Sequence, residues 1–92
     1  MTNMKTATVV QVIDGKSFRL RTDAILVIDG LNIPERGTEG AKKAQEKLEE
    51  LVLKKKISYE TTTWDALGRT NAKIYLDELD IKEAMEAFLR TL

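Results

Sequence analysis

Apolar and polar residues alternate over short stretches in the first third of the chain, a pattern typical of β-strands. Residues 6–13 alternate loosely and residues 17–21 alternate cleanly. Residues 24–28 follow as an unbroken apolar run, which is the pattern of a strand covered on both faces. The first two are separated by Asp14-Gly15 and the last two by Thr22-Asp23, both of which are turn signals. The pattern therefore predicts three strands joined in sequence as a meander.

From Glu39 onward the apolar spacing changes from two to about 3.6, which indicates an amphipathic helix. Arg36-Gly37-Thr38 is predicted to be a loop in which Thr38 is the helix N-cap. Two i,i+4 ion pairs are expected on the solvated face, Glu39 with Lys43 and Lys42 with Glu46. The lysines at 54–56 stand where cations complement a helix dipole. Strand-like spacing returns over residues 57–63 and 70–76, with a turn predicted at 65–68. Asp80, followed three residues later by a glutamate, predicts a capping box at the start of a last helix.

The predicted order of elements is βββ-α-ββ-α, in a single domain over residues 1–92. Five short strands with a helix after the third describe an α+β or mainly β fold, an OB-type five-stranded barrel closed off by helices. An open α+β sheet is the main alternative. We expect the barrel core and the helix face that covers it to contain the following residues: Phe18, Leu20, Leu26, Ile28, Ile74 and Leu76, with Leu48 and Leu51 from the helix.

Charge and composition narrow the possible functions. The chain has 15 basic and 15 acidic residues, so it lacks the basic excess of a dedicated nucleic-acid binder. It contains no cysteine and no histidine, which excludes disulfides, thiolate nucleophiles, the usual zinc sites and histidine bases. No apolar run reaches the ~18 residues of a membrane span, and no signal-peptide pattern is visible. We expect a cytoplasmic protein, or a mature or excised secreted domain.

Three short motifs lie in order between the predicted elements: Asp14-Gly15-Lys16-Ser17, Asn32-Ile33-Pro34-Glu35 and Leu67-Gly68-Arg69. With the elements around them, these motifs resemble the staphylococcal nuclease-like (thermonuclease) family, over most of the chain from Thr6 to Leu89. The resemblance implies an OB-type barrel. It also implies descent from enzymes that hydrolyse DNA and RNA with the help of calcium.

The resemblance also implies roles for individual positions, and most of them have changed. Glu35 stands where the family has its general base, and Arg69 where it has a phosphate-binding arginine. The two calcium-binding carboxylates are replaced by Lys16 and Asn32, and the arginine of the third strand by Val27. Because calcium affinity follows the charge of its ligands, we expect no metal site and no calcium cofactor. The resemblance thus implies a catalytically degenerate member.

The leading interpretation is a binding or interaction module, for nucleic acid or for a protein partner, rather than an enzyme. Any association with single-stranded nucleic acid should be weak, since the net charge is zero. Basic side chains gathered on one face, including Arg21, would favour nucleic acid, and an exposed apolar patch would favour protein. The candidate ligand-binding side chains are Lys16, Arg19, Asn32, Trp64 and Lys73.

Two alternatives remain for the residues that match the family's active site. One is a weak phosphodiesterase that uses Glu35 and Arg69 as vestigial catalytic residues. The other is a structural role, in which Glu35 pairs with Arg69 or with Lys16. Trp64 could stack on a base or close one end of the barrel.

Overall fold

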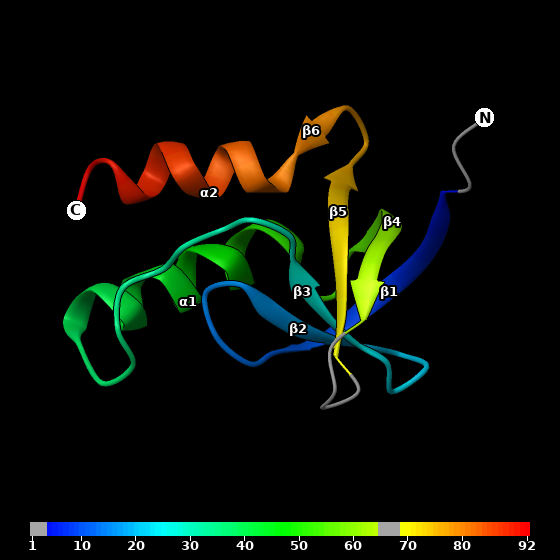
Figure 1. Ribbon diagram of the computed structural model, residues 1–92, viewed down its shortest axis with the longest axis horizontal. Coiled ribbons are helices and arrows are strands. Elements are labelled where there is room, and N and C mark those ends of the chain that lie inside the picture. The colour runs from blue at the N-terminus through cyan, green and yellow to red at the C-terminus, as the bar shows by residue number, and fades with distance from the viewer. Residues whose placement is uncertain (1–3, 65–68) are drawn as a thin grey trace.

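The computed structural model describes residues 4–64 and 69–92, which form six strands and two helices (Figure 1). The elements follow in the order β1 (Lys5–Val12), β2 (Ser17–Leu20), β3 (Ile25–Ile28), α1 (Glu39–Val52), β4 (Lys56–Trp64), β5 (Thr70–Leu76), β6 (Leu79–Asp80) and α2 (Ile81–Leu89).

The first five strands close into a barrel. Neighbouring strands run in the order β3-β2-β1-β4-β5, and β3 also pairs with β5. That closing pair is parallel, with Leu26 beside Thr70 and Ile28 beside Ala72, and the other pairs are antiparallel. The predicted five-stranded barrel is therefore confirmed, and its topology fits the OB type. The added strand β6 pairs with the end of β5 and was not predicted, because two residues are too few to show a period.

The two predicted turns of the first half shape the meander. Asp14 accepts a hydrogen bond from the backbone N–H of Lys16 through its Oδ1 atom, at 2.9 Å, which tightens the turn between β1 and β2. Asp23 has a φ of 72° in the turn between β2 and β3, a left-handed conformation that aspartate tolerates better than most residues. Both turns were expected from the sequence.

One apolar cluster fills the barrel and the space beneath α1. Leu26 and Ile28 are both 1% exposed within it, whereas Val27 between them lies outside the cluster. This alternation is what a strand requires, because successive side chains point to opposite faces. Of the residues predicted for the core, Leu51 and Leu76 are partly buried and pack against the cluster. The other predicted members, Phe18, Leu20, Leu26, Ile28, Leu48 and Ile74, are fully buried in it.

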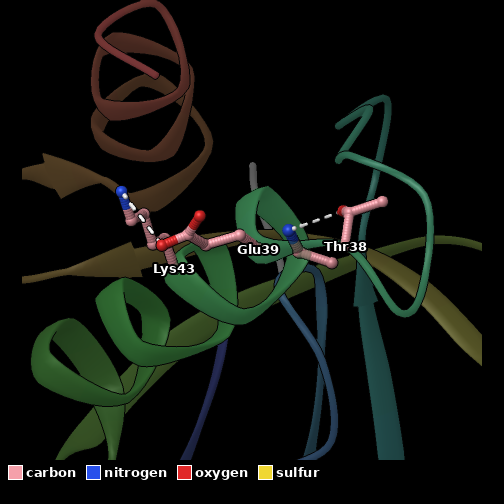
Figure 2. A network of polar contacts seen from close by, with 4 residues as sticks. Thr38, Glu39 and Lys43 are labelled. Carbon is pink, nitrogen blue, oxygen red and sulfur yellow. Dashed lines mark hydrogen bonds and ion pairs between the residues drawn. The ribbon is translucent and has the colours of Figure 1, made fainter.

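Helix α1 begins at a side-chain cap. The Thr38 hydroxyl accepts a hydrogen bond from the backbone N–H of Ala41 at 3.1 Å, and Figure 2 shows it turned toward the first turn of the helix. It also donates to the carbonyl of Glu35 at 2.6 Å. On the outer face, Glu39 and Lys43 form an exposed ion pair at 3.9 Å, as expected from their spacing (Figure 2).

The lysine run lies beyond the end of α1 rather than in its last turn. The helix ends at Val52, and its last turn contains no basic residue. Lys54 adopts a positive φ of 63°, and the ammonium group of Lys55 donates to the carbonyl of Glu50 at 3.3 Å. The lysine run therefore connects α1 to β4, and the Lys55 ammonium group contacts the C-terminal end of the helix.

Helix α2 packs beside α1, and the two run in opposite directions (Figure 1). Asp80 caps α2 by accepting hydrogen bonds from the backbone N–H groups of Lys82 and Glu83, which is the N-cap half of the predicted capping box. The ammonium group of Lys47 on α1 lies 5.6 Å from the centre of the Phe88 ring on α2. Over residues 4–64 and 69–92, neither helix has the length and apolar character needed to cross a membrane.

Candidate ligand-binding site

A cleft of about 370 Å³ opens between the β1–β2 turn, the segment after β3 and the N-terminal half of α1. Its size falls within the range of about 300–1,000 Å³ that is common for ligand sites. We call it the turn–helix cleft. Its lining is half apolar or small and half polar, and consists of Ile13, Asp14, Ile33, Pro34, Arg36, Gly37, Thr38, Ala41, Lys42 and Gln45.

The walls of the cleft are held in place by close packing. A Cβ atom on Gly15 would lie 2.7 Å from the Cβ atom of Ala44 and 3.3 Å from Cγ2 of Ile33, so the turn touches both the helix and the following segment. Ile33 packs against the hydrophobic core. Pro34 comes next and restricts both its own backbone and that of Ile33. The cleft is therefore built on the packed core.

Polar groups surround the apolar surface of this cleft. Arg36 and Lys42 supply two positive charges, Gln45 supplies an amide, and Asp14 supplies one carboxylate. Within the described ranges, neither cation takes part in an ion pair. Oδ1 of the Asp14 carboxylate accepts a hydrogen bond from the backbone N–H of Lys16. The cleft thus offers an apolar contact surface beside two available cations.

Glu35 and Arg69 are not brought together. Glu35 is exposed, lies outside the lining of the cleft, and uses its carbonyl oxygen to accept hydrogen bonds from Thr38. Arg69 is also exposed and comes just before Thr70, which pairs with Leu26 near the start of β3. The segment with Glu35 instead follows the opposite end of β3, as Figure 1 shows. Among the ion pairs of the described residues, none joins Glu35 to Lys16.

The two positions matched to calcium ligands have different surroundings. Lys16 is half-buried, and its carbonyl accepts a hydrogen bond from the N–H of Ile28 at 2.7 Å. Asn32 is exposed and lies beside α2, in a shallow cleft with Glu86, Leu89 and Arg90. No group of three carboxylates, histidines or cysteines that could hold a metal ion occurs in the described part of the chain. This donor set does not fit calcium, which takes six to eight oxygen ligands.

Two of the candidate basic side chains have polar or acidic neighbours. Arg19 donates a hydrogen bond from its guanidinium group to the side-chain oxygen of Gln11. Lys73 stands directly opposite Glu60 on β4 and shares another cleft with Asp29. A phosphate backbone approaching Lys73 would therefore meet carboxylates on both sides, which weakens any attraction.

Some of the expectations fall outside the described residues. The predicted turn at 65–68 lies there, and so does the side chain of Trp64, although its backbone ends β4 opposite Thr70. The proposed stacking or plugging role of this tryptophan stays a prediction.

The polar side chains of the turn–helix cleft were missed by the sequence analysis. Helical spacing predicts an ion pair between Lys42 and Glu46, but Lys42 lines the cleft, and none of the ion pairs of the described residues joins these two. The sequence indicates no more for Arg36 than a place in a loop. A usable signal was present, because Arg36 and Lys42 flank the N-cap Thr38 and so belong to the same end of α1.

The chain was also compared with known proteins. No family model matches it, and no curated protein matches it.

Proposed function

We propose that this domain is a binding module, and that its ligand occupies the turn–helix cleft. The observation that carries the proposal is the composition of that cleft. Ile13, Ile33 and Pro34 offer apolar contact, while Arg36 and Lys42 carry positive charge and form no ion pair within the described residues. A ligand that fits this surface has an apolar part next to an anionic group.

We further propose that the barrel is a catalytically degenerate relative of the staphylococcal nuclease-like family. Support comes from the closed five-stranded barrel, from the helix after its third strand, and from the motifs around Asp14 and Glu35 in that order. The expected loss of activity follows from Lys16 and Asn32, which supply no carboxylate at the positions that the resemblance assigns to calcium.

The phosphodiesterase alternative has less support. It needs Glu35 and Arg69 at one reacting phosphate, but Glu35 follows the end of β3, whereas Arg69 precedes the residue of β5 that pairs near the start of β3. General-base catalysis by one carboxylate contributes about 10²–10⁴-fold at best. That factor is small compared with the slowness of uncatalysed phosphate ester hydrolysis. Binding is therefore the function that we favour.

Small probes can test the cleft before any natural ligand is known. We suggest titrating ¹⁵N-labelled protein with hexanoate and phenyl phosphate, and recording backbone amide shifts by NMR. Hexanamide serves as the uncharged counterpart of hexanoate. We expect saturable shifts at Ile13, Gly37 and Ala41 with both anions and weaker ones with hexanamide, because the cations Arg36 and Lys42 contribute to binding.

A pair of charge-matched double variants provides the control. Arg36→Glu with Lys42→Glu reverses both cations of the cleft, whereas Lys5→Glu with Lys56→Glu reverses two exposed cations on β1 and β4. Only the first should abolish the shifts. If the anions shift amides elsewhere on the barrel, or if both double variants respond alike, the proposed site is wrong.

A further inference from the structure

We propose that the occupant of the turn–helix cleft is a short extended segment of a partner protein, with an apolar side chain between acidic ones. This inference rests on the proposed function, because it names the ligand class for the same site. Protein and nucleic acid can both supply negative charge to Arg36 and Lys42. The remaining lining residues separate the two classes.

Asp14 favours a peptide over a nucleic-acid strand. Among the described residues, its carboxylate accepts one hydrogen bond, from the N–H of Lys16 to Oδ1, which leaves Oδ2 to accept another. A peptide backbone supplies an N–H donor at every residue except proline. A DNA backbone has only anionic and acceptor oxygens, and in RNA the 2′-hydroxyl is the one donor of the backbone. The Asp14 carboxylate therefore repels the phosphates and meets fewer donors than on a peptide. The Asp14 carboxylate thus favours a peptide backbone over a nucleic-acid backbone in this cleft.

Gln45 and the apolar surface point the same way. The side-chain amide of Gln45 both donates and accepts, as a peptide group does, and can pair with either face of an extended backbone. Ile13, Ile33 and Pro34 provide aliphatic contact for a side chain such as leucine. The acidic neighbours of that leucine would then lie toward Arg36 and Lys42.

The absence of aromatic side chains argues against nucleic-acid bases. Proteins that bind single strands without sequence preference stack the bases on aromatic rings. Among the described residues, no aromatic side chain lines the turn–helix cleft. Elsewhere in the described chain, Phe88 packs beside Lys47 on the helices, and Tyr75 lines clefts on another face of the barrel. The cleft therefore lacks the stacking platform that a base would need.

Three pentapeptides and one oligonucleotide test the proposal on the intact domain. The peptides are acetylated and amidated, with the sequences Gly-Glu-Leu-Glu-Gly, Gly-Gln-Leu-Gln-Gly and Gly-Glu-Gly-Glu-Gly. The first has both charge and apolar contact, the second lacks the charge, and the third lacks the leucine. The oligonucleotide is pentathymidylate. Amide shifts in ¹⁵N-labelled protein report where each probe binds and how tightly.

We expect the Glu-Leu-Glu peptide to give saturable shifts at Ile13, Gly37 and Ala41, and both other peptides to bind more weakly. Reversing Arg36 and Lys42 together should weaken the first peptide about tenfold or more, since two charge contacts are lost and replaced by repulsion. Lys5→Glu with Lys56→Glu should leave its affinity unchanged. Well-dispersed amide spectra of both double variants would show that each remains folded.

Each contrary result has a separate meaning. If pentathymidylate shifts the cleft amides and the Glu-Leu-Glu peptide does not, the ligand class is wrong although the site stands. Equal binding of the glutamine peptide would overturn the requirement for acidic side chains. If hexanoate and phenyl phosphate bind in the cleft but no peptide does, this inference fails and the proposed function survives. If no anionic probe reaches the cleft, both fail.

Discussion

A Cβ atom added to Gly15 would lie only 2.7 Å from the Cβ atom of Ala44, so the first turn of the barrel rests directly on α1. Real Cβ atoms essentially never come so close, and the nearest neighbours include the backbone carbonyl carbon of Ala44, at 3.3 Å. Neither partner can move away cheaply. The turn forms one wall of the turn–helix cleft and the helix another, so this contact holds the two walls against each other.

We therefore predict that Gly15→Ala destabilises the domain. Overpacking of this kind costs about 1–3 kcal/mol. For a domain of this size, the melting temperature should fall by about 4–8 °C for each kcal/mol. Thermal unfolding followed by circular dichroism would measure the change. Gly15→Ala should also reduce binding of the peptide probe, because the wall of the cleft must shift.

A double-mutant cycle with Ala44→Gly isolates the contact. Ala44→Gly alone should cost about 1 kcal/mol, the penalty for glycine inside a helix. In the double variant the added methyl group occupies the space that Ala44 gave up, so its total loss should be smaller than the sum of the two single losses. Strictly additive losses would show that the two residues do not contact each other in solution.

Leu26→Ala should be among the most damaging substitutions in the barrel. Leu26 is 1% exposed and belongs to the single core cluster. Truncating such a leucine costs about 2–5 kcal/mol, a large part of the stability of a small domain. Val10→Ala, at a side chain that is 46% exposed, is the matched surface control and should change little. An unchanged melting temperature for Leu26→Ala would mean that the strand register is wrong.

Most of the barrel could be predicted because strand patterns are local. Leu26 and Ile28 belong to the core cluster and Val27 between them does not, which is the alternation that a period of two requires. The capping residues Thr38 and Asp80 were equally visible, since a cap is defined within four residues of sequence. The strand β6 was not visible, because its two residues form a strand only where they meet the end of β5.

The candidate site could not be predicted in the same way. Its lining comes from residues near 13, 33–38 and 41–45, and they meet only when the turn packs on α1. Helical spacing paired Lys42 with Glu46, but such exposed pairs contribute too little to decide where a lysine points. Glu35 and Arg69 were placed together by resemblance. The parallel pairing of β3 with β5 places Arg69 near the start of β3, whereas Glu35 follows the end of β3. That pairing joins residues far apart in the sequence, so no local pattern predicts it.

Ser17→Ala should not destabilise the domain. Ser17 is 2% exposed, and its hydroxyl oxygen has no hydrogen-bond partner among the described residues. A buried polar group without a partner costs about 1–3 kcal/mol, so its removal should be neutral or should raise stability by about 1 kcal/mol. Urea unfolding at constant pH measures the difference. A loss of more than 1 kcal/mol would indicate that an ordered water satisfies this hydroxyl.

Thr38→Ala should weaken the start of α1. The Thr38 hydroxyl accepts from the N–H of Ala41 and donates to the carbonyl of Glu35, so alanine leaves both groups without this partner. Removal of an N-cap costs about 1 kcal/mol. Thr38→Ser keeps the hydroxyl and should restore most of the loss. Glu39→Gln, which breaks only the exposed pair with Lys43, should cost less than about 0.5 kcal/mol.

The last prediction concerns the chemistry that the family resemblance implies. The unmodified protein should bind calcium no better than an exposed protein surface does, and should not nick plasmid DNA. In the described chain, the first turn offers one carboxylate, Asp14, and it already accepts the N–H of Lys16. The Lys16 ammonium would repel a divalent cation, by roughly 8 kcal/mol at 4 Å and an effective dielectric of about 20. Asn32 lies beside α2, where it adds a neutral oxygen at most.

Calorimetric titration with calcium and a plasmid-nicking assay check this prediction together. Both should give no signal above that of a buffer blank. Glu35→Gln and Arg69→Lys are the informative variants, because the phosphodiesterase alternative assigns catalysis to these two residues. Any residual nicking that they leave unchanged would come from a contaminating nuclease. Calcium-dependent nicking by the unmodified protein that disappears in Glu35→Gln would instead show that Glu35 acts as a base, and the degenerate interpretation would have to be abandoned.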